Sequence, residues 1–139
     1  MKLNKKGFTL IELLAVIAIL AILVVLAVPN ILNLFQDSRT RAYQVDAQSV
    51  YEAAQTQWQL DQFGSNHAAG DTTYSDSNNP LTNSSISKAA KYCVKINNKG
   101  EVTWFAYSQA GFYAHPTGSK INKNDITISQ AETQASCGS

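Results

Sequence analysis

The sequence predicts an α+β fold in which a long N-terminal α-helix, first transmembrane and then amphipathic, packs on a small antiparallel β-sheet headgroup. Three observations predict it. Residues 8–28 form an almost unbroken apolar run, apolar residues then recur at helical spacing to about Phe63, and short alternating segments rich in Val, Thr and aromatic residues follow. At 139 residues and 15.1 kDa, the chain is about one domain long, which argues against a multi-domain enzyme.

The composition narrows the class of protein further. Hydrophobic residues make up 45% of the chain and charged residues 15%, so this is not a disordered acidic or basic chain. The formal net charge is +1 and no run of Lys or Arg exceeds a pair, which argues against a dedicated nucleic-acid-binding domain. Two cysteines are too few for a zinc site of their own, and no cofactor is expected.

The apolar run at residues 8–28 has the length of a membrane-spanning helix. Its 21 residues span about 30 Å as a helix, which matches the hydrocarbon core of a bilayer. Lys2, Lys5 and Lys6 precede it and predict a cytoplasmic N-terminus by the positive-inside rule. A secretory signal peptide is the alternative, but the run is longer than a typical signal core and no small-x-small cleavage site closes it.

Glu12 is the one ionisable side chain inside this run. A carboxylate in a membrane helix costs about 2.5 to 3.5 kcal/mol on insertion scales. Such a residue is normally retained where a partner or a function requires it. We therefore treat Glu12 as a candidate functional residue.

Residues 5–14, Lys-Lys-Gly-Phe-Thr-Leu-Ile-Glu-Leu-Leu, followed by the apolar run to Pro29, resemble the class III signal of type IV prepilins. The short leader and Phe8 resemble the type IVa subclass. The resemblance implies that residues 1–7 are a leader peptide, that a prepilin peptidase on the cytoplasmic side cuts after Gly7, and that Phe8 becomes an N-methylated N-terminus. It covers about the first quarter of the chain.

The resemblance also implies roles in assembly for Glu12 and Pro29. Glu12 would pair with the positively charged N-terminus of Phe8 on a neighbouring subunit, which would specify the axial register more than it adds strength. The alternative is a protonated Glu12 without a role. Pro29 cannot donate to the carbonyl four residues earlier, so a kink or local loss of helix is expected before it. Many relatives carry a glycine midway along the run, where this chain has Ala21, and this departure weakens the expectation of helix melting there.

Residues 29–63 predict an amphipathic helix, with Gly64 as its stop. Aromatic residues on its apolar stripe favour packing against a sheet over an aromatic ladder for electron conduction. The stripe expected to cover the sheet comprises Ile31, Phe35, Tyr43, Ala47, Val50, Tyr51, Ala54 and Trp58.

Residues 64–139 predict a globular headgroup. Residues 65–85 are mostly Ser, Asn, Asp, Thr and Gly, which predicts a solvated polar loop. Its Asp71, Asp76 and Asn78 offer oxygen ligands for calcium but lack the spacing of a calcium loop. Residues 83–85 fit a glycosylation sequon, which is weak evidence by itself.

Residues 91–129 predict the β-sheet. An alternating segment at 91–96, a turn at 97–100 and a β-rich run at 101–108 form a hairpin signature. A third strand is expected at about 111–114 and a fourth at about 125–129.

Cys93 and Cys137 are expected to form a disulfide. Both lie on the side exported from the cytoplasm, and closing a loop of 44 positions restricts the unfolded chain by about 4 kcal/mol in the entropic model. Two free thiols are the alternative.

His67 and His115 have no recognisable nucleophile or metal-ligand spacing beside them, so both are expected at the surface. No catalytic residue, metal site or enzyme activity is expected.

The resemblance implies a structural subunit of a type IV pilus, held in the cytoplasmic membrane before assembly and found in an extracellular surface filament afterwards. Its expected partners are further copies of the same chain, the prepilin peptidase, an assembly ATPase and platform protein acting indirectly, and a host-cell or surface receptor. Without the leader lysines the chain has eight basic and ten acidic side chains, so no specific nucleic acid is expected. The alternatives are a pseudopilin of a type II secretion or competence DNA-uptake system, and an enzyme or receptor tethered by its N-terminal helix.

Overall fold

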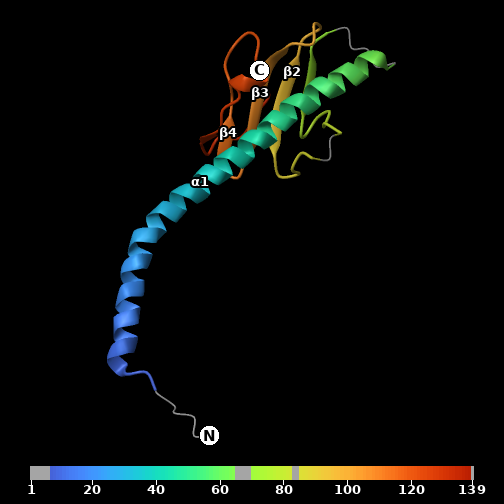
Figure 1. Cartoon of the computed structure of the whole chain (residues 1–139). Helices are drawn as coiled ribbons and strands as arrows, with labels where there is room; N and C mark the ends of the chain where they lie inside the picture. The colour runs from blue at the N-terminus through green and yellow to red at the C-terminus, as the bar shows by residue number, and fades with distance from the viewer. Residues whose placement is uncertain (1–6, 65–69, 83–84, 139) are drawn as a thin grey trace, which may run out of the picture. The chain divides into compact units, whose positions relative to one another are not determined.

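The computed structural model describes residues 7–64, 70–82 and 85–138. The leader lysines, His67, and Asn83 with Ser84 of the sequon lie outside these residues. Within these residues, one long helix is followed by short strands and a 3-10 turn (Figure 1). The elements are α1 (Leu10–Phe63), β1 (Thr72–Ser75), β2 (Lys91–Ile96), β3 (Val102–Gln109), β4 (Phe112–Ala114), η1 (Lys123–Asp125) and β5 (Ser129–Gln130).

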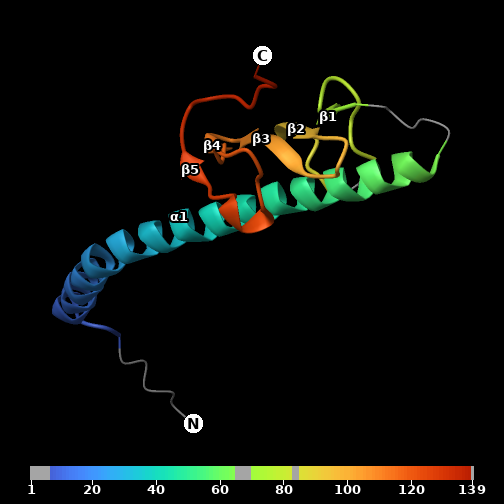
Figure 2. The same cartoon turned by 90° about the horizontal axis from the view of Figure 1, so that it is seen from above.

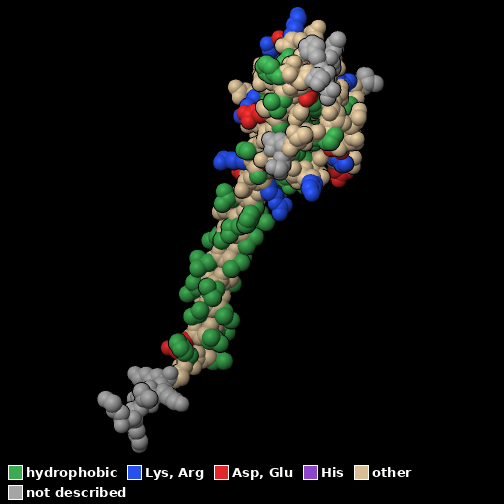
Figure 3. Space-filling view, turned by 90° about the vertical axis from the view of Figure 1, so that its right-hand side faces the viewer, with side chains coloured by type: hydrophobic (Ala, Val, Ile, Leu, Met, Phe, Trp, Pro, Cys, Tyr) green, Lys and Arg blue, Asp and Glu red, His purple; other side chains and the backbone are tan. Residues whose placement is uncertain are grey.

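The chain divides into two compact units, Met1–Ser38 and Arg39–Ser139, called here the N-terminal unit and the globular unit. Each contains part of α1. In the N-terminal unit, every described residue is exposed. Hydrophobic side chains cover the visible face of its helix in Figure 3.

The globular unit is built on a five-stranded antiparallel sheet with the order β1-β2-β3-β4-β5. Neighbours in the sheet are also neighbours in the sequence, so the strands join by simple local connections. The β2–β3 hairpin pairs Cys93 with Ala106, and its register shifts between Lys95 and Ile96. The sheet lies along the part of α1 that belongs to this unit (Figure 2).

Small residues on α1 allow the sheet to approach the helix closely. Ala47, Val50 and Ala54 lie one helical turn apart and are fully buried. They pack in one core cluster with strand residues such as Val94 and Phe105. Burial of a side chain the size of Phe contributes about 1.5 to 3 kcal/mol, so this layer of contacts holds the unit together.

Three aromatic residues of the predicted stripe, Tyr43, Tyr51 and Trp58, lie in the core or pack against it, as expected. Tyr51 is buried and donates its hydroxyl to the backbone oxygen of Ile121 at 3.0 Å. The Tyr43 ring lies 4.6 Å from that of Phe112. Trp58 packs partly buried against the same core, and these contacts account for the aromatic spacing without any other role.

The predicted stripe is wrong at its N-terminal end. Ile31 and Phe35 are exposed, and both belong to the N-terminal unit. Helical spacing identifies one face of a helix but does not say whether the chain's own sheet covers that face.

Pro29 does not interrupt α1 in this structure. The local loss of helix expected before it is therefore not found. Next to it, the Asn30 side-chain amide donates to the backbone oxygen of Leu26 at 3.4 Å.

The predicted polar loop at 65–85 contains a strand that the sequence analysis missed. Residues 72–75 form β1, which pairs with β2 from Thr72 opposite Ile96 to Ser75 opposite Cys93. Tyr74 is fully buried in this strand, and its hydroxyl donates to Asp61 at 2.7 Å. One buried aromatic residue among polar neighbours is too short a signal for periodicity to detect.

The predicted fourth strand at 125–129 is also wrong. Lys123–Asp125 is a 3-10 turn, and strand pairing is confined to Ser129–Gln130. The Asp125 carboxylate accepts the backbone N–H of Asn122 at 2.7 Å. This local bond favours a turn over an extended strand.

Candidate processing and assembly site

Gly7 and Phe8 lie before the first turn of α1. Both are exposed, and a side-chain carbon built at Gly7 would meet nothing within 4 Å. Phe8 is 91% exposed. The peptide bond between them is therefore open to an approaching enzyme and is not held in helical hydrogen bonding.

Thr9 and Glu12 close the start of α1 with reciprocal hydrogen bonds. The Thr9 backbone N–H donates to a Glu12 carboxylate oxygen at 2.9 Å, and the Glu12 N–H approaches the Thr9 hydroxyl oxygen at 3.4 Å. The Thr9 carbonyl accepts the N–H of Leu13 at 3.2 Å. This is a capping box, in which two backbone donors at the helix end gain side-chain partners. Glu12 therefore also initiates the helix of its own chain.

Glu12 stands in an otherwise apolar helical surface. Among the described helices, α1 contains a window that is long and apolar enough to cross a membrane, and no part of that window is buried. Exposed side chains include Leu13, Ile17 and Leu20. An apolar surface of this extent needs lipid or other protein to cover it.

The chain matches the protein family described as the prokaryotic N-terminal methylation motif, over residues 2–28. The chain carries the class III signal of type IV pilins and pseudopilins. This motif implies processing by a prepilin peptidase and assembly into a pilus-like filament. Together with the apolar helix, it indicates a membrane-anchored precursor. No curated protein and no solved structure shows a significant match.

The predicted cleavage site and the predicted assembly carboxylate lie close together in the sequence. Gly7, Phe8 and Glu12 lie within six positions, at the entry to α1. Pro29 lies further along the same helix. The family is made of structural subunits that are generally not enzymes.

The capping role of Thr9 was not predicted from the sequence. The signal was available, because Thr-Leu-Ile-Glu at residues 9–12 has the spacing of a capping box before an apolar run.

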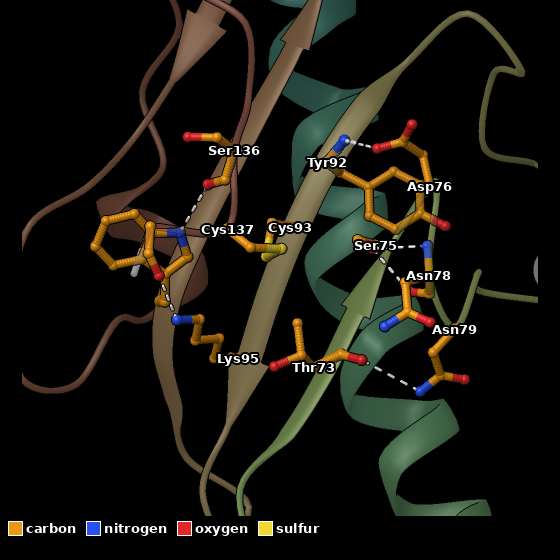
Figure 4. The surroundings of a disulfide bond; sticks show 12 residues. Thr73, Ser75, Asp76, Asn78, Asn79, Tyr92, Cys93, Lys95, Ser136 and Cys137 are labelled. Atoms are coloured by element: carbon orange, nitrogen blue, oxygen red, sulfur yellow. Dashed lines mark hydrogen bonds between the residues drawn. A yellow bond between two sulfur atoms is a disulfide. The ribbon is translucent and has the colours of Figure 1, made fainter.

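The predicted disulfide between Cys93 and Cys137 is present, with the two Cα atoms 5.2 Å apart. Figure 4 shows it on the face of β2 that carries Lys95. The bond attaches the end of the chain to the sheet. A disulfide is typical of proteins that fold outside the reducing cytoplasm, which agrees with export of the globular unit.

His115, which the sequence predicts at the surface, has partners on the sheet. It is half-buried, its Nδ1 lies 2.7 Å from the backbone oxygen of Phe105, and its ring lies 4.4 Å from that of Trp104. Asp76 was named above as a side chain that could offer an oxygen ligand for calcium. In the structure its carboxylate pairs with the Lys91 ammonium at 2.9 Å and accepts the backbone N–H of Tyr92.

Proposed function

We propose that this chain is the structural subunit of a type IV pilus, which polymerises through its N-terminal helix into a surface filament for adhesion and twitching motility. The observation that carries the proposal is an uncovered apolar helix with one carboxylate, placed directly behind a class III signal. A folded, disulfide-bonded globular unit follows it and would form the filament's outer surface.

The first step is processing at the cytoplasmic face of the membrane. A prepilin peptidase cuts after Gly7 and methylates the new amino group of Phe8. The exposed, non-helical backbone at this point supports the assignment. The processed subunit stays in the membrane until an assembly ATPase and platform protein act on it.

The second step transfers the apolar helix from lipid into a bundle of neighbouring helices. Glu12 then lies in a low-dielectric environment, where an unpaired charge is expensive. The amino group of Phe8 on a neighbouring subunit offers a partner at the correct axial stagger. The Thr9 backbone N–H supplies a local hydrogen bond to the same carboxylate before that partner arrives.

Pro29 is proposed to act within the filament. Pro29 has no backbone N–H and cannot donate a helical hydrogen bond. The helical turn before it is therefore the weakest point of an otherwise regular helix. Melting before Pro29 would then require forces or contacts that an isolated subunit does not experience.

A pseudopilin of a type II secretion or competence system is the second candidate. The same methylation motif supports it equally, and it would form a short piston instead of a long surface fibre. The third hypothesis is an enzyme or receptor tethered by its N-terminal helix, which requires neither cleavage after Gly7 nor assembly through Glu12.

The deciding experiment measures the intact mass of the protein in material sheared from the producing cells, with electron microscopy of the same fraction. A chain that begins at Phe8, carries one extra methyl group and lacks two hydrogens, found in long thin fibres, would support the pilus subunit. Processed protein without fibres would favour the pseudopilin. Full-length protein confined to membranes would favour the tethered reading and overturn the proposal.

A further inference from the structure

The last residues of the chain are attached to the sheet by more than the disulfide. We call residues 131–138 the C-terminal tail. The Ala131 N–H donates to the Gly111 carbonyl at 3.1 Å, and the Ala135 N–H donates to the Ser108 hydroxyl at 2.8 Å. The tail is therefore hydrogen-bonded to β3 and to the β3–β4 turn before it reaches the disulfide.

A second pair of contacts holds the end of the tail. The indole N–H of Trp104 donates to the Ser136 carbonyl at 3.1 Å, and the Lys95 ammonium donates to the Gly138 carbonyl. The Lys95 ammonium also lies 5.6 Å from the centre of the Trp104 ring. These two side chains, which we call the tail clamp, therefore hold both residues that flank Cys137.

Gly138 fits this clamp because it lacks a side chain. A Cβ atom at that position would lie 2.5 Å from a carbon of the Trp104 ring, a separation that real Cβ atoms essentially never show. The ring thus occupies the space beside the tail backbone. In Figure 4 the hydrogen bonds of Ser136 and Lys95 lie on the same side of the bond between Cys93 and Cys137.

The two sulfur-bearing residues differ in their access to solvent. Cys93 is 1% exposed, whereas Cys137 is exposed. A thiol–disulfide exchange reaction needs an approach to the sulfur that is attacked or that attacks. The buried residue is therefore closed to an external reagent for as long as the tail stays docked.

We propose that the tail clamp docks the reduced tail, so that Cys137 is the entry thiol for a disulfide-bearing oxidant and Cys93 is the resolving thiol. Trp104 and Lys95 are positioning residues in this scheme. They raise the local concentration of one sulfur at the other by holding the residues on both sides of Cys137. The inference concerns the globular unit and holds whether or not the chain forms a pilus.

The reaction balances in two exchanges. The Cys137 thiolate attacks one sulfur of the oxidant's disulfide, so that a mixed disulfide forms and the other oxidant sulfur leaves as a thiol. The Cys93 thiolate then attacks the Cys137 sulfur and releases the second oxidant sulfur. The protein loses two protons and two electrons, and the oxidant's disulfide is reduced to two thiols.

The test uses the full chain in detergent, with glutathione disulfide as the oxidant and mass spectrometry as the readout. We expect the adduct on Cys137 in Cys93→Ser to form about tenfold or more faster than the adduct on Cys93 in Cys137→Ser. In denaturant the two rates should converge, which controls for the intrinsic chemistry of the two thiols. Equal rates under native conditions would overturn the assignment of entry and resolving thiols.

The clamp itself is tested in the Cys137→Ser background. Lys95→Ala and Trp104→Phe each remove one hydrogen bond and should each raise the adduct rate at Cys93 about fivefold. Lys99→Ala, an exposed lysine on the β2–β3 turn, is the matched control and should leave the rate unchanged. Trp104→Phe keeps a ring in place, so folding is preserved. If neither clamp variant changes the rate, docking does not depend on the clamp and the proposal fails.

Discussion

The two parts of α1 place similar residues in opposite environments. Val25, in the N-terminal unit, is 72% exposed, whereas Val50, in the globular unit, is fully buried. Both are valines in the same continuous helix. Apolar content therefore does not tell whether a helix face is covered by its own chain. In the globular unit a sheet covers the face, and in the N-terminal unit the cover has to come from lipid or from other subunits.

The largest effect is expected from a change at Glu12, which lies in the N-terminal unit. Glu12→Val should reduce filament yield by about tenfold or more, because the register pairing is lost while the globular unit is untouched. The measurement is the amount of sheared protein, with cleavage followed by mass. Glu132→Val, at an exposed acid of the globular unit, is the control. A normal filament yield from Glu12→Val would contradict the proposed role of Glu12 in assembly.

Removal of the disulfide should act on the globular unit alone. The double change Cys93→Ser with Cys137→Ser should lower the free energy of unfolding by about 4 kcal/mol, because the loop of 44 positions is no longer closed in the unfolded chain. Thermal or urea unfolding of the chain in detergent measures it. A loss below about 1 kcal/mol would mean that the bond contributes little beyond the contacts already described.

The two valines form a matched pair on one helix. Val50→Ala should lower the free energy of unfolding of the globular unit by about 2 kcal/mol, because it leaves a cavity against the sheet. Val25→Ala should change the same quantity by less than about 0.5 kcal/mol. Urea unfolding followed by tryptophan fluorescence reports on the globular unit, which contains both Trp residues. Equal losses would show that the two units are energetically coupled.

High pH should destabilise the globular unit and leave the N-terminal unit unaffected. Burial raises the pKa of Tyr74 and Tyr107 above the ordinary value near 10, and the hydrogen bond to Asp61 adds to this at Tyr74. The unfolded tyrosines lose their protons first, so stability is complete well below pH 10 and falls as pH rises through it, by about 1 kcal/mol for each tyrosine between pH 10 and 11. Urea midpoints across this range measure it. Tyr74→Phe should make the fall shallower, and an unchanged slope would contradict the assignment.

The smallest expected effect lies in the β3–β4 turn. Ala110 and Gly111 both have positive φ, at 50° and 81°, as a two-residue hairpin turn requires. Ala110→Asn should stabilise the globular unit by about 0.5 to 1 kcal/mol, because Asn adopts this conformation at lower cost. Gly111→Ala should act in the opposite direction. The two Tm shifts test the turn together, and a decrease for Ala110→Asn would show that the turn is not strained.

Much of the architecture could be predicted from local patterns. The helix end at Phe63, the β2–β3 hairpin and the third strand follow from periodicity, a glycine stop and a turn sequence, all of which act over a few residues. The strand β1 could not be predicted this way. Its stability comes from pairing with β2, whose partner residues lie about 20 positions away.

The candidate site also combines features that local sequence patterns predict with features that depend on long-range contacts. Gly7, Phe8 and Glu12 were found because the class III signal is a contiguous motif. The Thr9 capping box is equally local, and the spacing of Thr9 and Glu12 would have been enough to predict it. The tail clamp could not be found, because Lys95 and Gly138 are 43 positions apart.

The membrane-length helix, the processing signal and the carboxylate within it could be identified without a structure, because each depends on residue type and spacing along one short stretch. The sequence also predicted which two cysteines pair, since the chain has two. The tertiary structure alone decided which valines are buried, that Cys93 is shielded while Cys137 is exposed, and that Trp104 and Lys95 hold the tail. Burial and long-range contacts depend on which segments the fold brings together, and no local pattern specifies that.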